Sequence, residues 1–393
     1  MTPDGWREAK LGDVIALEYG KALAERARSP GPIPVFGSNG IVGSHCVSLV
    51  RGPGIIVGRK GTVGAVCWSK SDFWTIDTTY FVRPRNNTDL RFIYHLLGSM
   101  GLARLNSATG VPGLNRNDAL ASPIKLPPLP EQRKIAAILS SVDETIENTE
   151  AVINQLQVVK KSMMEELLTR GMPGRHKQFK KTEVGDIPKT WNVVSLEDLC
   201  SHVVDCPHAT PVYTDSGPKV IRTADVVPGQ ILLAQARHVS DETYRGRIAR
   251  LEPQPGDILY SREGERFGIA APIPPSERLC LGQRMMQFRA SRETDAEFLC
   301  WLLNSQIVYR QAVEGVGGST SPHVNVGSIR RFVVPRPPLD EQRLVGHALS
   351  TVAANEAAYH QLGAELRALK SSLLEDLLSG EVRVKVTGTE AAA

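Results

Sequence analysis

Two short loops combine glycine with cationic side chains, a composition that suits the binding of an anion or of a nucleic-acid base. The first is GRKGT at 58–62, which places Arg59 and Lys60 at the tip of an expected hairpin; the second is REGER at 262–266. Backbone N–H groups of glycine-rich turns hold phosphates, and arginine is the usual bidentate partner of guanine. A solvated hairpin explains one such loop equally well. The recurrence of Ser261-Arg262 at the matching place favours contact with nucleic acid.

Two more polar loops lie near the start of each expected domain. GSNG at 37–40 contains Ser38 and Asn39, and DCPHAT at 205–210 contains His208 and Thr210. Hydroxyl, amide and imidazole groups of this kind contact bases or the sugar-phosphate backbone. Neither loop is a specific motif by itself.

Four residues raise the question of a zinc site: Cys200, His202, Cys206 and His208. Their spacing, C-x-H-x3-C-x-H, lacks the paired CxxC knuckles of structural zinc sites and lies within one short run. Core cysteines and a polar loop explain these residues better. We therefore expect no bound metal.

Motifs of several enzyme classes are missing from the sequence. The chain has no GxxxxGK[ST], no GxSxG, no HExxH and no [ND]PP[YF] of amino-methyltransferases. We expect no nucleotide hydrolysis and assign no residue a catalytic role.

Short strands are expected to position the cationic loops. GIIV at 54–57, AVCW at 65–68 and TYFV at 79–82 are rich in β-branched and aromatic residues, and GDILYS, GIAAPI and MMQFRA repeat the pattern from residue 256. A helical segment follows each set, RFIYHLL from Arg91 and EFLCWLL from Glu297. Each domain is predicted to be a mixed α+β domain.

The sequence is a tandem duplication. PPLPEQR at 127–133 recurs 210 positions later as PPLDEQR at 337–343, and Leu139 falls over Leu349 at the same offset. The offset drifts upstream, where Trp6 matches Trp191. The long period excludes a solenoid and predicts one two-part module used twice, with pseudo-twofold symmetry.

A long helical pattern follows each PPLxEQR motif. Apolar residues recur every 3.5 positions over about four heptads, which is typical of a coiled-coil seam, and the proline pairs predict sharp helix starts. The seam residues are Leu139, Val142, Ile146, Ile153 and Leu156 in the first helix and Leu349, Val352, Tyr359, Leu366 and Leu373 in the second.

Two seams on one chain can satisfy each other, so we predict one intramolecular, antiparallel helical pair. The alternative is that each helix packs on its own globular domain. Lys160 and Lys370 take equivalent seam positions, where a charge fixes register at some cost in stability, and Glu356 is a candidate partner.

Composition is that of an ordinary globular protein. The 393 residues are 41% apolar and 22% charged, which excludes disordered and fibrous classes, and a net charge of +4 permits an anionic partner without requiring one. Six scattered cysteines indicate reduced thiols. Neither a signal peptide nor a membrane span is evident, so the cytoplasm is the expected compartment and no membrane contact is expected.

Taken together, these segments resemble the specificity subunit of type I restriction-modification systems. The matching pieces cover nearly the whole chain in order: IPVFGSNGIVG, IIVGRKGTVG, TGVPGLNR, PPLPEQRKIA, KKTEVGDIPKTW, DCPHATP, GDILYSREGE, LGQRMMQ, PPLDEQR and LLSGEVRV. The resemblance implies two target recognition domains that each bind one half of a split, asymmetric site in double-stranded DNA. It also implies a helical spacer on which methyltransferase subunits dock.

The resemblance also implies the partners and their cofactors. Two modification subunits would bind S-adenosylmethionine and methylate adenine, and restriction subunits would use ATP and magnesium. This chain would need no cofactor and would be the non-catalytic, sequence-recognising component of the complex.

The expected domain limits follow from these assignments: a first recognition domain at 1–125, a first spacer helix at 126–170, a basic, solvated linker at 171–183, a second recognition domain at 184–335, a second spacer helix at 336–380 and a tail at 381–393. The candidate DNA-contact residues are Ser38, Asn39, Arg59, Lys60, Thr62, Asn115 and Arg116 in the first domain and His208, Thr210, Arg222, Thr223, Ser261, Arg262, Arg266, Gln283 and Arg284 in the second.

Two alternatives remain. A coiled-coil scaffold that joins two protein-binding domains would bind its partners without the steep salt dependence of a DNA complex. A self-sufficient DNA enzyme would need catalytic motifs that the sequence lacks.

Overall fold

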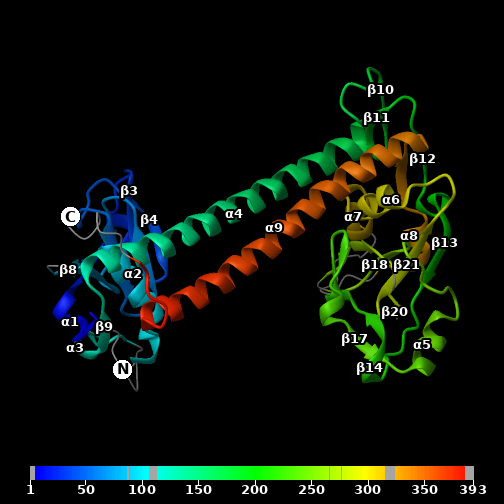
Figure 1. Cartoon of the computed structure of the whole chain (residues 1–393). Helices are drawn as coiled ribbons and strands as arrows, with labels where there is room; N and C mark the ends of the chain where they lie inside the picture. The colour runs from blue at the N-terminus through cyan, green and yellow to red at the C-terminus, as the bar shows by residue number, and fades with distance from the viewer. Residues whose placement is uncertain are drawn as a thin grey trace. The chain divides into compact units, whose positions relative to one another are not determined.

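The computed structural model describes residues 5–85, 88–105, 113–264, 266–275, 277–314 and 324–385. The tail beyond 385 and the TGVP part of the motif at 109–116 lie outside these ranges. Internal contacts divide the chain into unit 1, formed by Met1–Glu150 and Gln361–Ala393, and unit 2, formed by Ala151–His360. Each unit contains one globular domain and part of each long helix (Figure 1).

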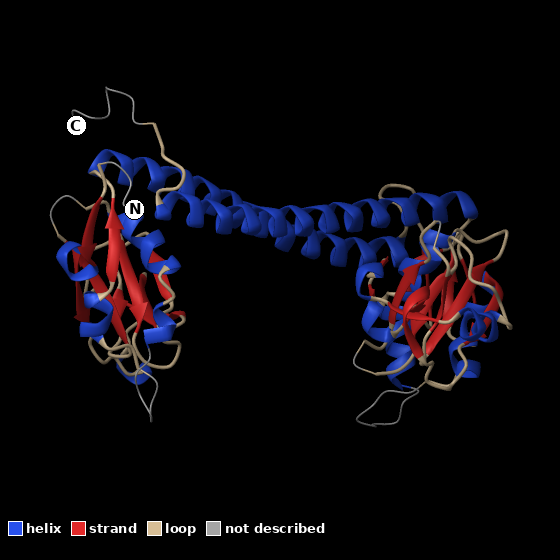
Figure 2. Cartoon of the chain, turned by 60° about the horizontal axis from the view of Figure 1, so that its bottom comes forward, coloured by secondary structure: helices blue, strands red, loops and turns tan. Residues whose placement is uncertain are grey.

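The first domain, in unit 1, is built on small sheets with short helices around them (Figure 2). Its strands are β1 Arg7–Lys10, β2 Ile15–Tyr19, β3 Ile33–Gly37, β4 Gly40–His45, β5 Gly54–Gly58, β6 Val66–Ser69, β7 Trp74–Thr75, β8 Thr79–Pro84 and β9 Pro123–Leu126. Its helices are α1 Leu11–Val14, η1 Glu25–Ala27, α2 Leu90–Ser99, η2 Leu102–Leu105 and α3 Arg116–Ala121. The sheets have the orders β2-β8-β5-β6, β4-β3-β7 and β1-β9.

The second domain, in unit 2, contains the same elements with additions. Its strands are β10 Phe179–Thr182, β11 Gly185–Pro188, β12 Asn192–Ser195, β13 Cys200–Asp205, β14 Tyr213–Ile221, β15 Val226–Val227, β16 Gln230–Ile231, β17 Arg237–Val239, β18 Ile258–Ser261, β19 Ile269–Pro272, β20 Leu279–Leu281, β21 Met285–Ala290 and β22 Val333–Arg336. Its helices are η3 Leu196–Leu199, η4 Thr223–Asp225, η5 Leu233–Gln235, α5 Asp241–Ile248, α6 Ala296–Leu303, α7 Gln306–Glu314 and α8 Val326–Arg330.

The duplication is visible in the sheet topology. The sheet β13-β21-β18-β19 repeats β2-β8-β5-β6, all antiparallel, and β17-β14-β20 repeats β4-β3-β7 with one antiparallel and one parallel pairing in each. The registers Gly58↔Thr79 and Ser261↔Met285 fix which residues correspond. The mixed α+β prediction is confirmed for both domains.

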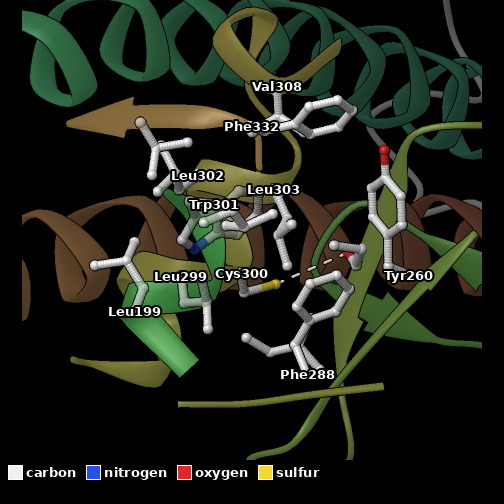
Figure 3. Packing of buried hydrophobic residues seen from close by; sticks show 14 of the residues in the cluster. Leu199, Tyr260, Phe288, Leu299, Cys300, Trp301, Leu302, Leu303, Val308 and Phe332 are labelled. Atoms are coloured by element: carbon white, nitrogen blue, oxygen red, sulfur yellow. Dashed lines mark hydrogen bonds between the residues drawn. The ribbon is translucent and has the colours of Figure 1, made fainter. Parts of the chain in front are cut away.

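The core of the second domain forms around α6, which packs against β18, β19 and β21 (Figure 3). After Glu297 the segment FLCWLL is apolar on all sides, so residues 298–303 are buried all round, and Cys300 Sγ donates to Ala270 O over 3.8 Å. Asp295 caps the helix by accepting from Phe298 N, as Asp89 caps α2 by accepting from Phe92 N. Burial of such a continuous apolar segment fixes the sheet whose strand ends bear the cationic loops.

The two long helices are α4 Leu129–Arg170 and α9 Leu339–Ser379, and each begins directly after a proline pair. Pro128 O accepts from the N–H groups of the glutamate and glutamine of the motif, Glu131 and Gln132, as Pro338 O does from Glu341 and Gln342 in the second copy. The seam residues named above are buried or half-buried, except Tyr359, which is 36% exposed.

The helices pair antiparallel within each unit. In unit 1, Lys370 Nζ lies 2.5 Å from Asp143 Oδ1 and Arg367 Nη1 lies 2.9 Å from Glu150 Oε1. Residue numbers therefore rise along α4 in the direction in which they fall along α9. In unit 2, the expected pair of Lys160 with Glu356 forms. The predicted antiparallel pairing is confirmed, and its ends merge with the domain cores through residues such as Leu139 and Leu349.

The basic segment at 171–183 differs from the solvated linker that the sequence predicted. Its residues 179–182 form β10, and His176 Nε2 lies 2.7 Å from the buried carboxylate of Glu341. Arg175 pairs with Asp340. Two residues of this segment, Arg175 and His176, therefore contact acids at the start of the other long helix.

Candidate nucleic-acid interface

The loop at 58–62 leaves the end of β5 in a tight backbone path. A Cβ atom at Gly58 would lie 2.2 Å from Thr62 O and 2.8 Å from Ser38 O, so only glycine fits where these two loops meet. Arg59 N and Lys60 N both donate to Thr78 O, over 2.9 and 3.0 Å. The backbone thus fixes where the two cationic side chains begin.

Two arginine side chains of the first domain lie against the ring of Tyr19. Arg59 Cζ lies 5.1 Å and Arg116 Cζ 5.4 Å from the centroid of its ring. Leu114 N donates to Arg59 O over 2.8 Å, which ties the loop before α3 to the hairpin. Tyr19, Arg59, Lys60 and Arg116 line one hollow of about 330 Å³, together with Tyr80 and the backbone at 113–117.

Tyr80 is a buried residue in the lining of this hollow. Its hydroxyl donates to Leu114 O over 3.1 Å, and its ring meets Tyr19 edge-on at 5.0 Å. Burial, followed by the Tyr19 hydroxyl, raises the pKa of Tyr80 to about 12, against the lowering effect of Arg59 and Arg116. The phenol therefore stays neutral, and it adds no negative charge to the hollow.

Of the remaining first-domain candidates, Asn115 lines the hollow, and Ser38 and Thr62 lie beside the glycines of the loop at 58–62. Asn39 and Thr62 are exposed, and Ser38 is half-buried beside Gly61. Asn115 lines the hollow and uses its side-chain oxygen to cap α3, accepting from Asn117 N over 2.8 Å. The structure thus brings the sequence candidates of this domain together. Tyr19 was missed, although its place at the end of an alternating strand, IALEY, was a signal.

In the second domain, Thr210, His208 and Gln283 come together from two loops. Thr210 Oγ1 donates to Gln283 Oε1 over 3.0 Å, and Gln283 Nε2 donates to His208 O. Arg247, 8% exposed, holds the same loop through Pro207 O, Ala209 O and Leu281 O. Nothing in the local sequence of α5 distinguished Arg247 from the other cations of that helix.

Arg262 lies in the interior of the second domain. Its side chain is 2% exposed, with Nη2 3.0 Å from Glu263 Oε1 and 3.8 Å from Asp205 Oδ2, and Nη1 donates to Val324 O over 3.3 Å. Ser261 is fully buried. These positions support the loop from inside rather than present donors on its surface.

Three further candidates of the second domain lie at η4 or contact the strand that follows it. Arg222 binds Asp225 in a bidentate pair at 2.7 and 2.8 Å, and that contact raises the pKa of the guanidinium. Thr223 begins η4, and Arg266 donates to Val226 O over 2.9 Å. Arg284, by contrast, is exposed and has φ +67°, in the left-handed region.

The four residues considered for zinc play separate parts. Cys206 is buried, and burial, followed by Glu197, raises the pKa of Cys200 to about 12. His208 Nε2 lies 3.4 Å from Asp205. Within the described ranges, no three His, Cys, Asp or Glu side chains are grouped so as to hold a metal ion. No helix within those ranges is long and apolar enough to cross a bilayer.

The PPLxEQR motifs anchor each domain on its long helix. Glu131 accepts from Trp6 Nε1 over 3.0 Å, and Glu341 accepts from Trp191 Nε1 over 2.9 Å. The adjacent glutamines bind the backbone at the N-caps: Gln132 accepts from Asp89 N over 2.9 Å and Gln342 from Asp295 N over 3.0 Å. The sequence located this motif, but its contacts become evident only in three dimensions.

Comparison with protein families gives two matches on this chain. Residues 3–158 and 188–368 match the type I restriction modification DNA specificity domain. The chain is 28% identical to the MjaVIII specificity subunit of Methanocaldococcus jannaschii, over 98% of this chain and 94% of that protein. It is 22% identical to the EcoDI specificity subunit of Escherichia coli, over 97% and 89%.

Comparison with solved structures points to the same fold. The S subunit of a type I restriction-modification system from M. genitalium superposes with a TM-score of 0.69 at 15% identity, covering 95% of this chain and 96% of that one. A chain from a study of complex assembly and conformational transition in a type I system gives 0.52 at 19% identity, covering 97% and 100%.

Proposed function

We propose, on the premise of its family, that each of the two domains of this chain binds one half of a bipartite site in double-stranded DNA. The chain belongs to the family of type I restriction-modification DNA specificity subunits. One observation carries the proposal. β5 of the first domain and β18 of the second end at corresponding residues of their sheets, and polar loops lie together at that end of each strand. These loops are 37–40, 58–62 and 113–117 in the first domain and 205–210 and 282–284 in the second.

The two half-sites would be unlike. The corresponding residues that follow β5 and β18, Arg59 and Arg262, stand in different surroundings, one against tyrosine rings and the other among carboxylates. Different donors at one topological position would select different bases and different DNA shapes.

The helical pair would set the distance between the half-sites and bind the modification subunits. α4 has 42 residues, and at 1.5 Å per residue such a helix is about 60 Å long. Two modification subunits would supply S-adenosylmethionine-dependent adenine methylation, and restriction subunits would use ATP and magnesium. This chain would supply recognition alone.

The test is single-molecule sequencing for methyladenine in DNA from cells that express the chain with its methyltransferase subunit. Cells that lack the chain provide the control. A split motif that appears only with the chain supports the proposal and identifies both half-sites. Absence of a motif, with a methyltransferase that is active beside another specificity subunit, would favour a scaffold without DNA recognition.

Removal of one heptad from each helix tests the spacer. Seven residues shorten a helix by about 10 Å, which corresponds to about three base pairs of B-DNA. The methylated motif should keep both halves and change the spacing between them. Unchanged spacing would refute the spacer function and leave the recognition function intact.

A further inference from the structure

Two guanidinium groups of the first domain lie against the same ring. Arg59 and Arg116 come from loops 57 residues apart, yet both sit within about 5.5 Å of the Tyr19 centroid, and Arg59 also lies 6.0 Å from the Tyr80 ring. Contact of a guanidinium with a ring holds the charge in place, while its N–H groups remain able to donate. The hollow bounded by Tyr19, Arg59, Lys60 and Arg116 is called the Tyr19 notch below.

No carboxylate compensates these charges among the residues that the structure describes. Arg59, Lys60 and Arg116 form no ion pair there, and neither guanidinium donates a hydrogen bond there. The lining of the notch contains no acid, and the neighbouring sequence NSATGVP at 106–112 has none either. Three cations around about 330 Å³ repel one another, and a bound anion would relieve that repulsion.

In the second domain, the arginine at the same position is paired with carboxylates of its own domain. Tyr19 pairs with Tyr80 across β2 and β8, and Asp205 pairs with Met286 at the corresponding place across β13 and β21. The tyrosine of the first domain is thus replaced by a carboxylate, which lies 3.8 Å from Arg262, and Glu263, in the place of Lys60, lies 3.0 Å from Arg262. Within one chain, therefore, Arg262 is neutralised by carboxylates of its own domain, whereas Arg59 has no such partner among the described residues and can bind an external anion.

We propose that the Tyr19 notch binds a single phosphodiester of the DNA backbone, with Arg59, Lys60 and Arg116 as its ligands and Tyr19 as a positioning residue. This inference rests on the proposed function and deepens it. A guanine edge is neutral and is satisfied by one guanidinium. Three converging cations match a phosphate, whose negative charge and several acceptor oxygens can use more than one donor.

The salt dependence of DNA binding tests the notch. The full chain is titrated with a fluorescent duplex of arbitrary sequence over a range of salt concentrations, for wild type, Arg59→Gln and Arg116→Gln. The notch neutralises one phosphate, so its complete loss lowers the slope of log K against log salt by about 0.9; each single variant should lower the slope by part of this amount, and the double variant Arg59→Gln with Arg116→Gln by nearly all of it. Arg7→Gln, an exposed cation on the separate β1-β9 sheet, is the matched control and should leave the slope unchanged.

Tyr19 has its own test. Tyr19→Phe keeps the ring and should keep the wild-type slope, whereas Tyr19→Leu leaves every charge in place but should lower the slope because the guanidiniums are no longer held together. Equal slopes for the Phe and Leu variants would remove Tyr19 from the site.

The methylated motif separates this inference from the proposed function. Under the inference, Arg116→Gln lowers the salt slope and keeps both half-sites of the wild-type motif. If the first half-site relaxes instead, the notch binds bases, and the inference fails while the proposed function stands. If wild type gives no motif, the proposed function fails, and the slopes on arbitrary duplex still decide whether the notch binds phosphate.

Discussion

Tyr19 and Asp205 occupy corresponding positions at the ends of β2 and β13, and this difference, together with that between Lys60 and Glu263, gives the two domains different charges at the same place. In the first domain the ring holds arginines without neutralising them. In the second the carboxylate of Asp205 lies 3.8 Å from Arg262 and 3.0 Å from Arg250. A duplicated scaffold thus keeps its sheet register while it changes the charge that each domain presents.

Arg284 is held in a conformation that favours glycine. Its φ of +67° costs about 1–2 kcal/mol for a residue with a Cβ atom, and glycine loses about 0.5–1 kcal/mol in chain entropy when it is fixed. We predict that Arg284→Gly raises the free energy of unfolding by roughly 0.5 kcal/mol. The same change should weaken recognition of the second half-site, since strain of this kind is tolerated at functional positions.

Arg284→Ala separates the two effects. Alanine keeps the strained backbone and removes the guanidinium, so we expect the loss of recognition without the gain in stability. Guanidinium-chloride midpoints and the methylated motif give the two readouts. Stability that is lower for Gly than for Ala would show that the left-handed backbone carries no cost.

The buried carboxylate of Glu341 anchors the second domain on α9. It accepts from Trp191 Nε1 over 2.9 Å and from Met172 N over 3.2 Å, and His176 Nε2 lies 2.7 Å away. Glu341→Gln replaces one of the two acceptor oxygens by an NH2 group, so one of these donors loses its acceptor. We expect a loss of about 2–3 kcal/mol in the free energy of unfolding.

Asp340→Asn is the adjacent control. Asp340 also pairs with a cation, Arg175, but its side chain is 63% exposed, and exposed pairs contribute at most about 1 kcal/mol. Tryptophan fluorescence during denaturation reports both variants, because Trp191 touches the anchor. Equal midpoints for the two variants would contradict the anchoring role.

Much of this architecture was predictable because it depends on local pattern. The 3.5-residue repeat predicted the paired helices, and β-branched runs beside glycine turns predicted the strands that carry Arg59 and Arg262. The repeated EFLCWLL and RFIYHLL segments predicted α6 and α2. In each case a short window holds the residues that decide the structure.

The charge environment of the candidate residues was only partly predictable in this way. Glu263 follows Arg262 where Lys60 follows Arg59, which is a local difference, but the other part of the difference arises from Tyr19 and Asp205, which lie 40 and 57 residues upstream of the two arginines. Sequence indicated that both arginines would contact DNA, whereas the fold buries one among acids. Contacts between distant loops follow from strand register, and one sequence alone does not fix that register.

His95 predicts an acid sensitivity of unit 1. Burial lowers the pKa of His95 to about 4, Asp143 raises it, and Lys370 and Arg91 lower it. An unfolded histidine titrates near 6.5, so between pH 6.5 and about 4 the unfolded chain takes up a proton that the folded chain does not. The free energy of unfolding should therefore decrease as the pH is lowered through this window, by up to about 1.4 kcal/mol per pH unit.

His95→Gln removes the titrating group and keeps a polar partner for Ser140, which lies 3.4 Å from His95 Nε2. The stability of wild type relative to this variant should drop by about 2 kcal/mol between pH 7.5 and pH 5.0, and urea midpoints at the two values measure it. Trp301 takes the place of His95 in the second domain, where it donates to Ser350, and an indole does not titrate. A constant difference between wild type and variant would mean that His95 is protonated as easily in the fold as outside it.

Lys160 and Glu356 predict how the helix register is specified. Their side chains are 19% and 12% exposed, so removal of one partner leaves a half-buried charge without its counterion. We expect Glu356→Gln to cost about 2 kcal/mol, between the values for exposed and buried pairs, and Lys160→Met with Glu356→Leu to stay within about 1 kcal/mol of wild type. Glu150→Gln, from the exposed pair with Arg367, should change stability by less than about 1 kcal/mol.

The apolar double variant should keep its stability and lose one of the constraints on its register. A slip of one heptad would place Lys160 against Leu349 in the wild-type chain, which buries an unpaired ammonium group; the double variant removes this penalty and leaves the register to the domain cores and the pair of Lys370 with Asp143. If the helices set the spacing of the DNA site, the double variant should methylate motifs with more than one spacer length. A single spacer length in its methylome would show that the apolar seam and the domain cores fix the register without the ion pair.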